Sequence, residues 1–207
     1  MDEIKFRAPA TITLAGASFS GKSSFLRKLI VSDVFDVPIN KVYYCYGTWT
    51  SDYEKLPSSV TLVSGLPDDF SFMYGGDNSG QRRHNLVCFD DLQDKIDDRV
   101  VQIFTTLSHH KNLSCVLVLQ NLYLDTKQAR NIAKNCHYTV LFRNPRAVSQ
   151  YRILGTQTGT RHLLAAYEDV IKSDKFGYLV VDLSPYSEQR LRLRTRIFPG
   201  EDCIVYK

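Results

Sequence analysis

One stretch of the chain, residues 11–30, restricts the possible folds more than any other. Residues 16–23 read GASFSGKS and match the pattern G-x-x-x-x-G-K-[ST]. An apolar run from Ile12 to Ala15 precedes the match, and a helix-like apolar pattern follows it. The motif therefore lies in the strand–loop–helix context that a phosphate-binding loop requires. This context disfavours the alternative, a Gly/Ser surface turn.

The residue types of this loop explain how it would bind a triphosphate. Gly16 and Gly21 let the backbone curl so that successive N–H groups point inward, at the positive end of the following helix dipole. Lys22 would reach the β- and γ-phosphates, and the Ser23 hydroxyl would ligate Mg²⁺. The predicted nucleotide-binding residues are Gly16, Ala17, Ser18, Phe19, Ser20, Gly21, Lys22, Ser23 and Ser24.

Length and composition are typical of an ordinary soluble globular protein. The chain has 207 residues, of which 43% are hydrophobic and 23% charged. No linker is evident, so we expect one domain over residues 1–207. No apolar run approaches the about 18 residues of a membrane span. The formal charge of +4 permits a polyanionic partner without requiring one. Five dispersed cysteines without a C-x-x-C pair are typical of buried thiols in an intracellular, reducing compartment.

Alternating apolar patterns indicate the fold class. Six β-like runs cover residues 42–45, 60–63, 86–89, 115–119, 138–142 and 178–181. Helical patterns lie between them, at 100–107 behind Asp97 or Asp98 as cap, at 129–133 and at 163–171. This order predicts an α/β, three-layer fold with a mostly parallel central sheet. Residues 47–58 and 75–85 are rich in Gly, Ser, Asn and Asp and are expected to be loops.

Two carboxylates follow the run at 86–89. Hydrolysis of a phosphoanhydride needs a carboxylate near Mg²⁺ and a base that polarises the attacking water. Asp90 would face the Mg²⁺ and Asp91 the water. The alternative is that Asp91 only caps a turn.

Polar side chains also end the next two strands. The amide of Gln120 could contact the γ-phosphate and the water, although glutamine is also common at surfaces. Pro145 ends the strand at 138–142, so Arg143 and Arg146 are displayed at the sheet edge where ligands collect in open α/β folds. A guanidinium there could reach a neighbouring subunit's γ-phosphate, or form a surface salt bridge instead.

The order of these strings resembles the FtsK/HerA superfamily of P-loop ATPases, which have the RecA/ASCE-like fold. The strings are GASFSGKSS, NLVCFDDL, LQNLY and TVLFRNPR. Within the superfamily the chain is most similar to the genome-packaging ATPases of poxvirus-like double-stranded DNA viruses and of Polinton/Maverick elements. The resemblance spans residues 8–155, and we expect strands in 177–207 to complete the same sheet.

The resemblance implies ATP and Mg²⁺ as ligands. Lys22 and Ser23 would bind phosphate and Mg²⁺, Asp90 would bind Mg²⁺, and Asp91 would be the general base. Gln120 would be the sensor, and Arg143 or Arg146 the finger acting between subunits. Position 91 departs from the many relatives that have Glu there. The family works as rings, commonly hexameric, that push double-stranded DNA through a channel. The resemblance further implies a homo-oligomeric ring of five or six copies and contacts with capsid proteins. It also implies a location in the infected host cell, in the nucleus or the cytoplasm, and in the assembling virion.

Basic residues near the C-terminus suit a DNA partner. Arginines alternate with other residues from 190 to 196, and in a strand they would share one face. A DNA-facing stripe and a solvated edge strand both explain this pattern. The candidate DNA contacts are Arg82, Arg83, Lys111, Arg190, Arg192, Arg194 and Arg196.

Two other function classes remain open on the sequence. A P-loop nucleotide or small-molecule kinase would need an acceptor pocket and typically a lid of closely spaced arginines. The pair Asp90-Asp91 followed by Gln120 favours hydrolysis by water over transfer. A nucleotide-gated assembly protein with little turnover would need only the loop.

Overall fold

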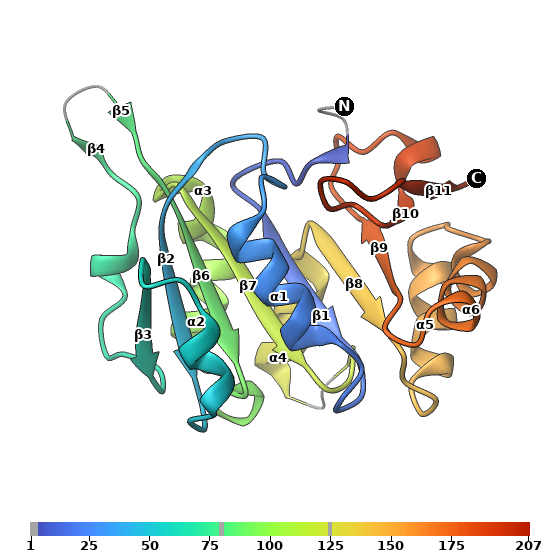
Figure 1. The fold of residues 1–207 in the computed structure, drawn as a ribbon, viewed down its shortest axis with the longest axis horizontal. Coiled ribbons are helices and arrows are strands. Elements are labelled where there is room, and N and C mark those ends of the chain that lie inside the picture. The colour runs from blue at the N-terminus through green and yellow to red at the C-terminus, as the bar shows by residue number, and fades with distance from the viewer. Residues whose placement is uncertain (1–3, 79–80, 124–125) are drawn as a thin grey trace.

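A mixed β-sheet is the centre of the structure (Figure 1). The computed structural model describes residues 4–78, 81–123 and 126–207, and within them nine strands form this sheet in the order β11-β10-β9-β8-β1-β7-β6-β2-β3. The strands are β1 (Thr11–Ala15), β2 (Ile39–Tyr46), β3 (Val60–Ser64), β6 (His84–Asp90), β7 (Leu113–Leu119), β8 (Tyr138–Phe142), β9 (Tyr178–Asp182), β10 (Leu193–Thr195) and β11 (Ile204–Tyr206).

Most of this sheet is parallel, as the sequence predicts. The strands from β8 through β1, β7, β6 and β2 to β3 pair in parallel, whereas β9, β10 and β11 add to the β8 edge in antiparallel fashion. Every residue of β1, β6, β7 and β8 is buried. Their continuous apolar runs reflect strands that are covered on both faces.

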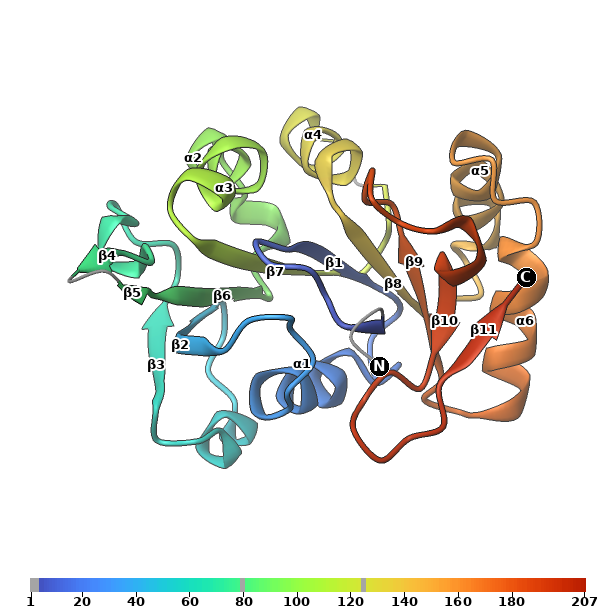
Figure 2. The same cartoon turned by 90° about the horizontal axis from the view of Figure 1, so that it is seen from above.

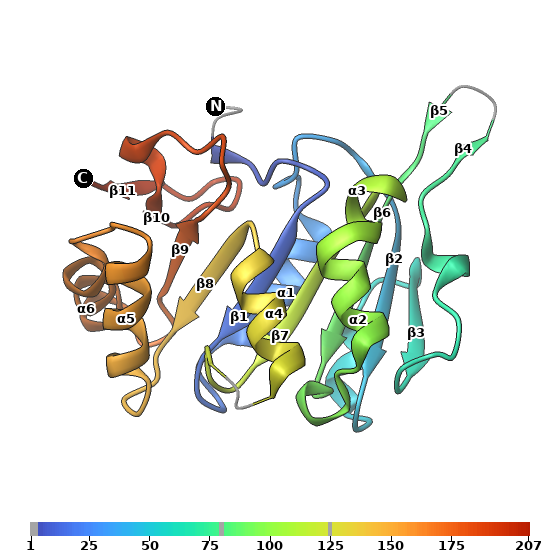
Figure 3. The same cartoon turned by 180° about the vertical axis from the view of Figure 1, so that it is seen from behind.

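Helices cover both faces and make three layers (Figure 2). The helix α1 packs on one face through Phe25, Leu26 and Leu29. The other face is covered by a group visible from behind (Figure 3), in which α2 runs into a π-helical turn at Ile103–Leu107 and then α3. The helices are α1 (Lys22–Val31), α2 (Asp98–Gln102), α3 (Ser108–His110), α4 (Lys127–Asn135), α5 (Val148–Gln157) and α6 (Leu163–Ser173). Of the two predicted caps, Asp97 and Asp98, it is Asp97 that accepts hydrogen bonds from the backbone N–H groups of Arg99 and Val100.

The structure differs from the sequence-based expectation in three segments. Helix α5 is not predicted, because its sequence VSQYRILGTQ carries few apolar residues. The expected loop at 47–58 contains a 3₁₀ helix, Ser51–Lys55, whose buried Tyr53 packs against Tyr44 with ring centroids 5.2 Å apart. The expected loop at 75–85 contains the short strands β4 (Asp77–Asn78) and β5 (Gln81–Arg82) and the first residues of β6.

Strand direction determines where the chemistry can lie. The parallel strands β1, β6 and β7 all end at the same edge of the sheet, which brings residues 16, 90 and 120 to that edge. The thiols of Cys45, Cys88, Cys115 and Cys136 are buried in the layers, and Cys203 is half-buried. Among the described residues, none of the helices is both long and apolar enough to cross a membrane.

Candidate functional site

The loop between β1 and α1 has the close backbone approach that the glycine pattern requires. A Cβ added at Gly16 would lie 2.5 Å from Cβ of Phe142 on the neighbouring strand β8. Gly21, with φ of 104°, is in the left-handed region that favours glycine and directly precedes α1. Both glycines are therefore required by the loop geometry, one for space and one for backbone conformation.

The ammonium of Lys22 lies inside this loop. Its Nζ donates hydrogen bonds to the carbonyl oxygens of Gly16, at 2.5 Å, and of Ala17, at 2.7 Å. Burial lowers the pKa of Lys22, and the carboxylate of Asp90 opposes that effect. The loop thus places one cation and the N-terminal end of α1 at the same point, and this arrangement favours the binding of an anion.

Asp90 ends β6 and is 9% exposed. The Tyr44 hydroxyl, from the neighbouring strand β2, donates a hydrogen bond of 2.6 Å to its Oδ2. Burial raises the pKa of Asp90, and the hydrogen bond from Tyr44 acts in the opposite direction. Burial and the nearby Asp90 carboxylate raise the pKa of Tyr44, so its hydroxyl keeps its proton and remains the donor.

Asp91 follows in a different environment. It is exposed and has a φ of 55°, an unusual conformation for a residue with a side chain. Gly47 lies directly beneath it, since an added Cβ would be 1.9 Å from the carbonyl oxygen of Asp91. The N–H of Gly47 also donates to the carbonyl oxygen of Asp90 at 3.0 Å. The end of β2 therefore supports the backbone that presents both carboxylates.

Gln120 follows the end of β7 and is exposed. Its backbone N–H donates to Oε1 of Gln93 at 3.1 Å. The Nδ2 of Asn144, which is buried, donates to the carbonyl oxygen of Gln120 at 2.9 Å. Two side chains thus hold the backbone of Gln120 without using its own side-chain amide.

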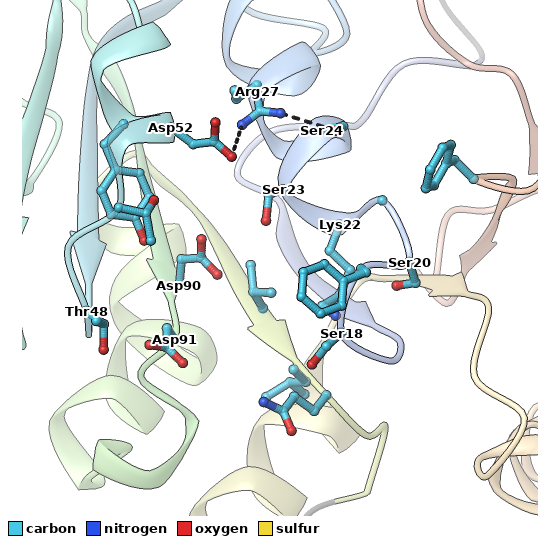
Figure 4. Close-up of a pocket in the computed structure, with 18 of the residues that line it drawn as sticks. Ser18, Ser20, Lys22, Ser23, Ser24, Arg27, Thr48, Asp52, Asp90 and Asp91 are labelled. Atoms are coloured by element: carbon cyan, nitrogen blue, oxygen red, sulfur yellow. Dashed lines mark hydrogen bonds and ion pairs between the residues drawn. The ribbon is translucent and has the colours of Figure 1, made fainter.

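These groups line one cavity of about 730 Å³ (Figure 4). Asp52 and Arg27, which form an ion pair at 3.4 Å, contribute to its wall. Of the predicted residues, those that line the cavity are Ser18, Phe19, Ser20, Gly21, Lys22, Ser23, Ser24, Asp90, Asp91 and Gln120. The predicted residues Gly16 and Ala17 instead form the base of the loop and bind Lys22 through their carbonyl oxygens.

The donor set of the cavity fits a hard divalent cation. Figure 4 shows the Ser23 hydroxyl and the Asp90 carboxylate on facing walls. Both are oxygen ligands, the type that Mg²⁺ prefers, and a bound triphosphate would supply further oxygens. These two residues could therefore hold Mg²⁺ beside a nucleotide.

The two predicted finger arginines lie outside the cavity. The backbone of Arg143 is next to the phosphate loop, because its carbonyl oxygen accepts a hydrogen bond from the N–H of Ala17 at 3.2 Å. Its side chain turns away and donates through Nη2 to the carbonyl oxygen of Ile171 in α6. Arg146 is exposed. Neither side chain is among the residues that line the cavity.

The expectation of a four-arginine face near the C-terminus is wrong. Only Leu193–Thr195 form a strand, and Arg190 belongs to a 3₁₀ helix, Gln189–Leu191. Arg194 is 1% exposed and pairs with Asp182 on the adjacent strand β9, at 3.0 Å, so it cannot contact DNA. Arg192 is helical in backbone and donates to the carbonyl oxygen of Thr158 at 3.2 Å. Arg196 is exposed, with φ of 54°.

The remaining basic candidates lie at the other end of the sheet. Arg83 and Lys111 are exposed and precede β6 and β7, respectively, so they lie at the edge opposite to Asp90 and Gln120. The Lys111 ammonium lies 5.6 Å from the centre of the Tyr74 ring. Arg82 belongs to β5, and its side chain is outside the part of the chain that the structure describes.

Sequence reasoning missed four residues that position the site, namely Tyr44, Gly47, Gln93 and Asn144. Asn144 lies inside the string FRNPR, but nothing in that string indicates its contact with Gln120. Tyr44 pairs with Cys88, two residues before Asp90, but nothing local in the sequence gives that register. Gly47 carries no signal of its own, since its importance arises from a contact with a different strand.

Comparison with known proteins defines the fold. No protein-family model matches the sequence, and no curated protein matches it. Among solved structures, the DNA-packaging ATPase B204 of Sulfolobus turreted icosahedral virus is similar, with a TM-score of 0.55 at 13% identity over 96% of this chain and 97% of that one. The genome-packaging NTPase B204 of Sulfolobus turreted icosahedral virus 2 is similar in complex with ATPγS, with a TM-score of 0.52 at 14% identity, covering 100% and 98%. In complex with sulfate, the same NTPase has a TM-score of 0.52 at 15% identity, covering 96% of each chain. At these low identities the likeness concerns the fold, and the chain has the three-layer P-loop ATPase fold that those two viral packaging proteins also have.

Proposed function

We propose that this protein is an ATPase that couples ATP hydrolysis to translocation of double-stranded DNA, as an oligomeric ring that packages a viral genome. The observation that carries the proposal is the convergence of Lys22, the pair Asp90-Asp91 and Gln120 on one cavity. The comparison with solved structures supports the proposal, because a DNA-packaging ATPase shares the fold over 96% of this chain. A phosphate cradle together with two carboxylates and an amide is suited to hydrolysis by water.

Nucleotide binding would begin at the phosphate loop. Lys22 would exchange the carbonyl oxygens of Gly16 and Ala17 for phosphate oxygens, which accept stronger, charge-assisted hydrogen bonds. Ser23 and Asp90 would hold the Mg²⁺, which supplies positive charge against the phosphate oxygens in the transition state. Because Tyr44 holds one oxygen of Asp90, the carboxylate is oriented before the nucleotide arrives.

Asp91 and Gln120 would act on the attacking water. The exposed carboxylate of Asp91 accepts its proton, and the amide of Gln120 orients it against the terminal phosphate. The backbones of both residues are held by neighbours: Gly47 packs under Asp91, and Gln93 and Asn144 bind Gln120. These contacts keep the side chains at the cavity without using their own functional groups.

The position of the arginines favours an assembly. Arg143 and Arg146 do not reach the cavity of their own subunit, so a charge-stabilising role requires the cavity of a neighbour. We propose a ring of five or six copies with this contact at each interface. DNA would contact exposed basic residues, for which Arg83, Lys111, Arg190 and Arg196 are the candidates that the structure leaves at the surface. Capsid proteins are the proposed docking partners of the ring.

The test is the rate of ATP hydrolysis with and without long duplex DNA, for the wild type and for Asp91→Asn. We expect DNA to stimulate the wild type, and the substitution to abolish hydrolysis while ATP binding persists, because the loop is unchanged. Phosphate that appeared on a small acceptor, with no response to DNA, would instead identify a kinase. Hydrolysis that survived Asp91→Asn at the wild-type rate would refute the assignment of the general base.

A further inference from the structure

An aromatic side chain lies beside the phosphate loop and has no role in the proposed hydrolysis. Phe176, in the turn between α6 and β9, is 52% exposed. The turn is well defined: the N–H of Phe176 donates to Oδ1 of Asp174 at 2.8 Å, and the N–H of Gly177 donates to the carbonyl oxygen of Asp174 at 3.1 Å. Gly177 has no room for a side chain, because an added Cβ would lie 2.8 Å from Val170. Phe176 is therefore a half-exposed ring on a rigid support.

The ring borders two cavities that meet at the start of α1. Phe176 lines the nucleotide cavity and also a second cavity of about 560 Å³, and Gly21 and Ser24 likewise line both. A Cβ added at Gly21 would be 3.3 Å from Cβ of Phe176 and 3.5 Å from Cδ1 of its ring, so the Phe176 side chain lies next to the phosphate loop. The second cavity continues past the ring toward Tyr178 and Phe198. A ligand that leaves the phosphate loop on this side would meet the Phe176 ring first.

The order of the strands sets the direction in which a nucleotide would lie. In the sheet, β1 has β7 and β6 on one side and β8 and β9 on the other. On the first side Asp90 ends β6 and Gln120 follows β7, whereas Phe176 precedes β9 on the second. The terminal phosphate must lie near the carboxylates and the amide for hydrolysis. The nucleoside at the other end of the triphosphate then points toward Phe176.

We propose that Phe176 is the platform on which the base of the bound nucleotide stacks. The inference rests on the proposed function, since it assumes that the loop binds a nucleoside triphosphate. Phe176 lines the nucleotide cavity and about half of the residue is exposed, so part of its ring can receive a base, and any nucleobase has a complementary face. The ammonium of Lys175 lies over the ring, 5.3 Å from its centre, so a base that stacked on that same face would have to displace it.

Another exposed phenylalanine of the cavity fits this role less well. Phe19 is 98% exposed at the apex of the phosphate loop, so almost none of its ring is held in place by neighbours. A base that stacked on it would have to immobilise the ring at a cost in entropy. Phe176 is about half buried, its backbone is held by the turn, and it lies on the nucleoside side of β1.

The experiment compares a ligand that has a base with one that has none. Calorimetric titration with ATP and with inorganic tripolyphosphate, both with Mg²⁺, is made on the wild type, Phe176→Ala, Phe176→Trp and Phe72→Ala. Phe72 is a matched control, because it is 50% exposed and lies in a 3₁₀ helix, Ser71–Met73, that lines neither cavity.

We expect Phe176→Ala to weaken ATP binding by about 5- to 150-fold, the range for loss of one base–aromatic stack, and to leave tripolyphosphate binding unchanged. Phe176→Trp, which keeps an aromatic face, should bind ATP at least as tightly as the wild type does. Phe72→Ala should bind both ligands normally. Equal losses for both ligands in Phe176→Ala would overturn the proposal, and so would unchanged ATP affinity. A wild type that bound tripolyphosphate but not ATP would refute the proposed function itself, whereas normal ATP binding that ignored Phe176 would refute only the platform.

Discussion

The hydroxyl of Tyr44 donates a hydrogen bond of 2.6 Å to Oδ2 of Asp90, from one parallel strand to the next. The two residues are far apart in the sequence, and both are buried at the cavity edge. The bond satisfies a carboxylate that would otherwise be buried with few partners. It also selects the orientation in which the other oxygen of Asp90 faces the site. Tyr44 is therefore a positioning residue for the proposed metal ligand.

Tyr44→Phe should lower both stability and ATP hydrolysis. Loss of a hydrogen bond to a buried charged group costs about 1.5–3 kcal/mol. We expect the free energy of unfolding to fall by that amount in urea titrations, and the hydrolysis rate to fall because Asp90 is no longer oriented. Tyr43→Phe is the matched control, since the Tyr43 hydroxyl donates to the carbonyl oxygen of Phe72 on the opposite face of the sheet. A Tyr43→Phe protein that lost as much activity as Tyr44→Phe would contradict this interpretation.

Gly47→Ala should impair hydrolysis more than nucleotide binding. The added Cβ would lie 1.9 Å from the carbonyl oxygen of Asp91, so that backbone must shift and carry the proposed base with it. We expect the turnover number to fall at least about tenfold, because small misplacements of catalytic groups are costly. Affinity for ATP, measured by calorimetry, should change little. Gly76→Ala is the control, because an added Cβ there meets nothing within 4 Å.

Arg143 and Arg146 can be tested by mixing subunits. Substitution of the finger arginine by alanine should reduce hydrolysis by about 10³-fold or more. When that variant is mixed with Lys22→Ala, activity should reappear, because the Lys22 variant supplies the arginine to an intact neighbouring loop. The arginine whose variant is rescued is the finger. Lys22→Ala mixed with Asp91→Asn should stay inactive, since each subunit then has a defective cavity of its own. Absence of rescue for both arginines would argue against a role across the interface.

His84 should make the protein less stable in acid. This histidine is 7% exposed and its Nε2 lies 2.8 Å from the Ser114 hydroxyl. Burial lowers the pKa of His84 from 6.5 to about 4. The unfolded chain therefore binds a proton between pH 6.5 and 4 that the folded chain does not, and stability falls as the pH decreases through that window. The shift corresponds to at most about 3 kcal/mol.

His84→Gln removes the titrating group and keeps a polar side chain that can contact Ser114. Urea titrations of the wild type and the variant at pH 7.0, 5.5 and 4.0 measure the effect. The difference in unfolding free energy between the two proteins should shrink or reverse toward pH 4. A constant difference across the three pH values would exclude this histidine as a source of acid sensitivity.

Arg194 should matter for stability and not for DNA. Its Nη1 pairs with Oδ2 of Asp182 at 3.0 Å, and both residues are buried. Arg194→Met leaves the carboxylate without its cation, which for a buried pair typically costs about 3–5 kcal/mol. Arg190→Ala, in an exposed pair with Glu188, should cost less than about 1 kcal/mol. Thermal unfolding measures both, and a folded Arg194→Met protein should retain wild-type affinity for duplex DNA.

The amino-acid sequence by itself was sufficient for the features that depend on near neighbours. The phosphate loop requires glycines, a lysine and a serine at fixed spacing between a strand and a helix, and all of these lie within residues 11–30. Continuous apolar runs predicted the buried parallel strands, and Asp97, one of the two predicted caps, caps its helix. Because parallel strands end at a common edge, the carboxylates after β6 and the amide after β7 could also be expected to meet at the cavity.

Only the tertiary structure decided which polar groups face each other across distant segments. The alternating arginines near the C-terminus suggested an exposed face, but the strand there has only three residues. Arg194 is instead buried in an ion pair with Asp182 on β9. Tyr44, Gly47 and Asn144 likewise act through residues on other strands. Their roles arise from strand register and close packing, which no local pattern encodes. Spacing along the chain therefore determined the loop and the strands, whereas packing determined which side chains support them.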